Sequence, residues 1–134
     1  MDWRECLKQR IAKETKEDKN MIISLLETAE IKFNSTDSLA DEFLISKISL
    51  LYDSLREILE ALPIKKGFKI YNHECYTAFL KEILNLSREA DIFDNLRKTR
   101  NAVNYYGKKL EKEEAEVVVE QLKNLILKFK KMMK

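Results

Sequence analysis

Glycine and proline are nearly absent from this chain, whose 134 residues include only 2 Gly and 1 Pro. A β-sandwich or β-barrel needs a turn every 8–12 residues or so, and those turns usually contain Gly, Pro or Asn-Gly. The scarcity of both residues therefore predicts an all-α protein with long helices. It also excludes glycine-rich phosphate loops, because Gly67 and Gly107 cannot supply G-x-G-x-x-G or G-x-x-x-x-G-K.

The size and polarity of the chain predict one soluble globular domain over residues 1–134. Hydrophobic residues make up 45% and charged residues 36% of the sequence, which is typical of a packed, water-facing domain. No apolar run approaches the roughly 18 residues of a membrane span, and the first residues are too polar for a signal peptide. We therefore expect a cytoplasmic protein that does not engage a membrane.

The metal-binding residue types are few. One His and two Cys without a C-x-x-C pair are a poor supply for zinc, so we expect no metal site and no cofactor. Cys6 and Cys75 are interpreted as two small apolar residues on buried helix faces, with a single disulfide as the alternative.

Helical spacing of apolar residues predicts three helices in the first half. The first runs from Asp2 to about Glu17, and the second carries an apolar stripe from Ile22 to Phe33. Ser38 and Asp41 have the spacing of a capping box for a third helix over 39–62, which Pro63 would end.

The third helix has more apolar surface than one bundle face needs. Besides its main stripe, Phe43, Ile45 and Tyr52 form a second apolar face. A helix that is apolar on more than one side lies at the centre of a bundle or in a dimer interface. The pattern predicts a homodimer.

The second half reads as a basic connector over 64–70 and three more helices. Asn72 is a good N-cap for a helix through Leu84, and Ser87 is placed to cap a helix that ends at Gly107. The last helix runs from about Lys112 to Met133 with an unbroken apolar stripe. The whole pattern predicts a single helical bundle of five to six helices.

Positive charge is concentrated in residues 95–109, which hold five Lys and Arg and no acid, although the whole chain has a net charge of only +2. The same segment contains two tyrosines and three asparagines. Cations interleaved with aromatic and amide side chains suit a ligand that carries phosphates and stacking bases. The alternative is a solvated helix end.

Arg100 is the most informative residue of this segment, because it continues the apolar line of Phe93, Leu96 and Val103. A guanidinium there must be paired or must open onto a cleft, since burying it alone costs several kcal/mol. A neighbouring polar face is formed by Arg97, Asn101, Asn104 and Tyr105. The candidate ligand contacts of the segment are Arg97, Asn101, Asn104, Tyr106, Lys108 and Lys109. The competing interpretation is that Arg100 pairs with a carboxylate from another helix and that the tyrosines close the end of the bundle.

The segment Phe93–Gly107, preceded by Lys66-Gly-Phe-Lys and Asn72-His-Glu-Cys75, resembles the archaeal branch of the HEPN superfamily. The resemblance implies a small, frequently homodimeric helical bundle. Members of that superfamily are RNases, toxins of toxin–antitoxin pairs, or partners of minimal nucleotidyltransferases. Their motif is Arg, a polar residue, a few more residues and then His. Arg100 and Asn101 match its first two positions.

The His of that motif is missing. Tyr105 or Asn104 stands in its place, depending on the spacing, and His73 precedes a different helix. A tyrosine titrates near pH 10 and is a poor general base at pH 7, whereas asparagine does not titrate. The resemblance therefore makes Arg100 and Tyr105 the candidate catalytic residues of a degenerate site that binds RNA or a nucleotide with little or no nuclease activity. The alternative is a non-enzymatic scaffold or the companion of a nucleotidyltransferase.

Overall fold

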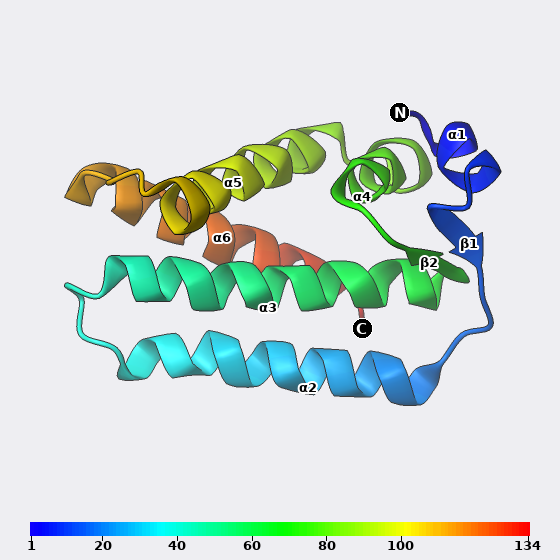
Figure 1. The fold of residues 1–134 in the computed structure, drawn as a ribbon. Coiled ribbons are helices and arrows are strands. Elements are labelled where there is room, and N and C mark those ends of the chain that lie inside the picture. Colours follow the sequence, from blue (N-terminus) through cyan, green and yellow to red (C-terminus); the bar gives the residue numbers. More distant parts are fainter.

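The computed structural model describes all 134 residues as six α-helices and one two-stranded sheet, which confirms the all-α class (Figure 1). Two short irregular helices, a 3₁₀ turn at Thr36–Ser38 and a π-helical segment at Phe79–Ile83, interrupt the series. The elements are α1 (Trp3–Lys8), β1 (Ala12–Glu14), α2 (Lys19–Ser35), α3 (Leu44–Lys65), β2 (Phe68–Ile70), α4 (His73–Ala78), α5 (Ser87–Tyr106) and α6 (Lys112–Met132).

Helix α3 is the centre of the fold, with α2 along one side and α5 and α6 along others (Figure 1). Its predicted main stripe is buried apart from the half-buried Leu44, and Leu55 of α3 and Leu122 of α6 both belong to one core cluster of 25 buried residues. Of its second apolar face, Tyr52 is buried inside the chain, whereas Phe43 and Ile45 are 51% and 44% exposed. The surplus apolar surface therefore lies only at the beginning of α3.

Both predicted ends of the third helix are wrong. The helix begins at Leu44 without a side-chain cap, and Asp41 pairs with Lys47 at 3.4 Å and forms no capping box. Pro63 lies inside the last turn and does not end the helix. Only the backbone donor of Pro63 is lost, and the following N–H of Lys66 still bonds to the carbonyls of Leu62 and Pro63.

The N-terminal segment also differs from its prediction as one helix to Glu17. Asp2 caps a helix of only six residues, and Arg10 then adopts a left-handed conformation with φ of 60°. The chain continues into β1, which pairs antiparallel with β2 in the connector expected to be irregular. Strands of three residues are too short to show a period of two, so helical spacing dominated the pattern.

The β1–β2 pair lies next to α1 and α4. Cys6 on α1 and Cys75 on α4 form a disulfide. The interpretation of these two cysteines as free buried thiols is therefore wrong. Their Cα atoms are 5.9 Å apart, within the range that a disulfide spans. Both residues are fully buried, as expected. The bond joins positions 69 residues apart.

The predictions for the last three helices hold with small changes. The Asn72 side chain accepts the N–H of Cys75, and Gly107 ends α5 with φ of +68°. Ser87 is the first residue of α5 and not its cap. Helix α6 ends at Met132, and its stripe is buried apart from the half-buried Val118. None of the helices combines the length and apolar character that crossing a membrane requires.

Candidate functional site

Packing of α5 against α3 decides where Arg100 lies. Two turns before it, Phe93 is buried and its ring stacks on Tyr52 of α3, with ring centroids 6.4 Å apart and planes within 4°. Leu96 is also buried on this face. The next residue along this line, Arg100, is therefore held over α3.

The guanidinium of Arg100 lies between two tyrosine rings. Its carbon is 5.1 Å from the ring centroid of Tyr52 and 5.3 Å from that of Tyr105, both within cation–π range. Nη1 donates to the Tyr105 hydroxyl at 3.0 Å and to Oδ1 of Asn101 at 3.4 Å, while Nη2 lies 3.8 Å from Oδ1 of Asp53. The sequence required pairing or a cleft for this cation, and Asp53 provides a long ion pair.

Arg100 retains unused hydrogen-bonding capacity. Its side chain is 17% exposed, and Nε is buried without a hydrogen-bond partner. A buried donor without a partner costs about 1–3 kcal/mol, more when it belongs to a charged group. The two aromatic faces offset part of that cost. The cation is thus fixed in place but incompletely satisfied.

Tyr52 forms the floor beneath this cation. Burial raises the pKa of its phenol, although the positive charges of Arg56, Arg100 and Arg97 oppose that shift. The ring is consequently a neutral aromatic surface at physiological pH, which suits its contact with a guanidinium.

Arg97 does not join Arg100. Nε and Nη2 of Arg97 both donate to Oδ1 of Asp94, at 3.2 and 3.0 Å, and Lys98 reaches the other oxygen of that carboxylate at 3.2 Å. Burial opposes ionisation of Asp94, but the hydrogen bonds from Arg97 and Lys98 outweigh it and lower the pKa. Both cations therefore pair with a single carboxylate, that of the residue just before the basic segment.

Arg97 instead borders a second, polar groove of about 580 Å³ between the N-terminus, α4 and α5. His73, the single histidine, lines the same groove with Glu74 and Lys81. The expected face of Arg97, Asn101, Asn104 and Tyr105 is therefore divided between two places. The helix carries Arg97 towards α4 and leaves the others at the far end of α5.

The far end of α5 is an exposed aromatic and basic surface. Tyr105 is 66% exposed, Tyr106 is 82% exposed, and Asn104 is exposed as well. The left-handed turn at Gly107 is followed by Lys108 and Lys109, which are exposed and have no carboxylate within ion-pair distance. We call these five residues and Asn101 the α5 surface.

Two residues of the Arg100 environment were missed by sequence reasoning. Tyr52 was interpreted as part of an apolar face, and Asp53 was not singled out at all. Tyr52 carried a usable signal, because an aromatic residue in the core stripe of a neighbouring helix is a natural cation–π partner. Asp53 carried none, since its role depends on how α3 and α5 pack.

No group of three or more His, Cys, Asp or Glu side chains is arranged to hold a metal ion. No protein-family model matches the chain, and comparison with curated proteins and with solved structures finds none that is significantly similar.

Proposed function

We propose that this protein binds single-stranded RNA or a nucleotide through the α5 surface and Arg100, in the manner of a HEPN-like domain that has lost its nuclease activity. The observation that carries the proposal is the incompletely satisfied Arg100 cation, which donates to the exposed Tyr105, with the exposed Tyr106 next along the chain. Large exposed aromatic rings next to cations are the usual means of holding a base and its phosphate.

The chemistry assigns a role to each part of the surface. Tyr106, which is the more exposed ring, offers a face on which a base can stack. Lys108 and Lys109 supply positive charge for phosphates, since their charges are not used within the chain. Asn101 and Asn104 supply amide groups that hydrogen-bond base edges.

Arg100 both orders this surface and supports ligand binding. Its hydrogen bond to the Tyr105 hydroxyl fixes that ring at the edge of the surface. A phosphate oxygen accepting from the guanidinium would replace the 3.8 Å contact with Asp53 by a shorter, charge-assisted bond.

We propose that this protein has little or no RNase activity. Tyr105 is the only member of the Arg100 cluster near the expected position of the motif His, and its hydroxyl already accepts a hydrogen bond from Arg100. His73 lies in the separate groove beside Arg97. Neither group is arranged to take a proton from a ribose hydroxyl next to Arg100. Tyr105→His tests this: RNase activity gained by the variant would identify position 105 as the lost base.

We also propose that the chain forms a homodimer through the beginning of α3. Phe43 and Ile45 are exposed there, beside a groove between α3 and α6 that is lined partly by Leu44, Leu110 and Val119. Exposed apolar side chains gathered at one groove mark protein contact surfaces.

A companion of a nucleotidyltransferase is the second candidate. Its support is that Arg97, Lys98 and Arg100, three of the five cations in the basic segment, are paired with Asp94 or Asp53. Such pairing is what a structural role for these residues would require, and the exposed apolar start of α3 would then face the partner protein.

Fluorescence anisotropy of a labelled 12-nucleotide single-stranded RNA tests the stacking role. Tyr106→Ala is expected to weaken binding about tenfold, because one base–aromatic stack contributes roughly 1–3 kcal/mol. Tyr106→Phe keeps the ring and should bind like the wild type. Equal RNA binding by all three proteins would exclude Tyr106 from the binding site. No RNA binding by the wild type would favour the second candidate, a companion of a nucleotidyltransferase.

A further inference from the structure

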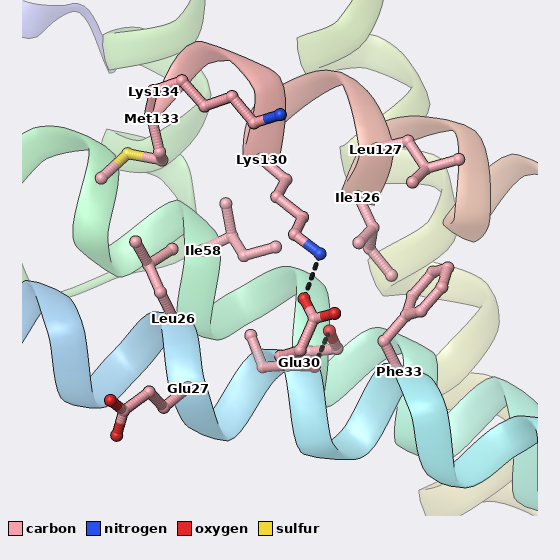
Figure 2. A pocket seen from close by; sticks show the side chains of 12 residues that line it. Leu26, Glu27, Glu30, Phe33, Ile58, Ile126, Leu127, Lys130, Met133 and Lys134 are labelled. Carbon is pink, nitrogen blue, oxygen red and sulfur yellow. Dashed lines mark hydrogen bonds and ion pairs between the residues drawn. The ribbon is translucent and has the colours of Figure 1, made fainter.

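Helices α2 and α6 both pack on α3, and between them lies a cavity of about 290 Å³ (Figure 2). Its walls are mainly apolar side chains: Leu26, Phe33, Ile58, Ile126, Leu127 and Met133. The cavity is on a different part of the molecule from the α5 surface, and none of its lining residues belongs to that surface.

The cavity exists because small residues form its floor. Ala29 on α2 and Ser54 on α3 are both buried there and leave space that a larger side chain would fill. The Ser54 hydroxyl donates to the carbonyl of Ala29 at 2.8 Å, so the floor offers no free hydrogen-bond donor. An occupant must therefore present an apolar body to this region.

The volume limits that body to roughly ten water-sized groups, since a water molecule occupies about 30 Å³ in the liquid. A protein helix would not fit without separating α2 from α6, because the ion pair between Lys130 and Glu30 crosses the opening (Figure 2). The size and this crossing favour a small molecule.

The rim of the cavity carries two lysines and two glutamates. Lys130 donates to Glu30 and thereby lowers the pKa of that carboxyl, which stays ionised. Lys134 extends beside Lys130 at the end of α6 and has no carboxylate within ion-pair distance, whereas the carboxylate of Glu27 points away from the cavity (Figure 2). An ammonium group has three donors, so Lys130 can hold Glu30 and a second acceptor together.

We propose that this cavity binds a small amphiphile with one anionic head, of the class of medium-chain carboxylic acids. The hydrocarbon chain lies between α2 and α6 against Ile58 and Ile126. The carboxylate is at the rim and accepts hydrogen bonds from Lys130 and Lys134.

The test uses sodium decanoate, below its micelle concentration, as the probe. Calorimetry should show saturable binding, and the methyl NMR signals of Ile58 and Ile126 should shift while that of the distant core residue Ile70 stays unchanged. Decanol, which has the chain without the charge, should bind at least tenfold more weakly.

Two lysine variants distinguish a specific contact with Lys130 at the rim from a general effect of positive charge. Lys130→Ala should weaken decanoate binding about tenfold, whereas Lys131→Ala, which removes an exposed and unpaired charge from the same helix, should leave it unchanged. The proposal is overturned if decanoate does not bind at millimolar concentration, if decanol binds equally well, if the shifts fall elsewhere, or if both variants behave alike.

Discussion

Reduction of the Cys6–Cys75 disulfide should cost this protein a large part of its stability. The bond closes a loop between positions 69 residues apart, which restricts the unfolded chain far more than the folded one. The loop-closure relation for that length gives about 4 kcal/mol at 25 °C. A domain of this size has a total unfolding free energy on the order of 5–15 kcal/mol, so the change is easily measured.

Urea unfolding followed by circular dichroism, with and without reductant, measures the effect. For a slope of about 2 kcal/mol per molar urea, the reduced protein should unfold at a midpoint roughly 2 M lower. Reduction removes no heavy atom: the S–S bond breaks and each sulfur takes up one hydrogen, so the expected loss comes mainly from the freedom that the unfolded chain regains.

The double variant Cys6→Ala/Cys75→Ala is the control and should unfold at the same midpoint in both buffers. Thiol titration of unreduced, unfolded protein should find no free cysteine. Two titratable thiols, or identical urea midpoints for the oxidised and the reduced wild type, would refute the conclusion that a disulfide between α1 and α4 stabilises the fold.

Four further outcomes are expected. Leu122→Ala should lower the unfolding free energy by roughly 2–5 kcal/mol in urea titrations, and a loss below about half a kcal/mol would contradict its place in the core. Gly107→Ala should cost about 1–2 kcal/mol, because the φ of +68° strains any residue with a Cβ even though nothing lies within 4 Å of that atom; no change in midpoint would argue against the left-handed turn. The proposed dimer should bury at least roughly 1,000 Å². Light scattering should therefore show a dimer for the wild type and a monomer for Phe43→Glu, and a monomeric wild type at micromolar concentration would exclude the proposed dimer. The hydrogen bond from Lys128 lowers the pKa of Glu89 from its ordinary 4.5. The stability that this pair contributes is therefore present above pH 4.5 and is lost as the pH falls through the lower pKa of the folded protein. Lys128→Ala should flatten that part of the pH–stability curve, and an unchanged curve would show that the pair contributes nothing.

Long amphipathic helices were predictable from the sequence, and short elements were not. Helix α6 was located to within one residue because its stripe, from Ala115 to Phe129, spans about four turns. The strands β1 and β2 were not anticipated, because their pairing depends on contacts between residues that are far apart in the chain. The disulfide is of the same kind: spacing alone does not show that α1 returns to α4.

The Arg100 environment shows where sequence reasoning stops at the site. The apolar line through Phe93 and Leu96 correctly indicated that this cation faces the bundle, with pairing as one of two outcomes. Helical spacing also placed Arg97 with Asn101, but Asp94, three residues earlier, holds the Arg97 guanidinium at the groove beside α4 and away from Arg100. Rotamer choice near a competing carboxylate is not encoded in helical periodicity.

Anisotropy of the labelled RNA with wild type, Arg100→Ala and Lys131→Ala tests the proposed function most directly. We expect the wild type to bind more weakly as salt rises, because phosphate contacts release counterions. Arg100→Ala should bind at least tenfold more weakly with its helical circular dichroism unchanged, and Lys131→Ala, which removes the same charge at an exposed position on α6, should bind like the wild type. Equal RNA binding by Arg100→Ala and the wild type at low salt would contradict the account and leave Arg100 as a structural partner of Asp53, Tyr52 and Tyr105.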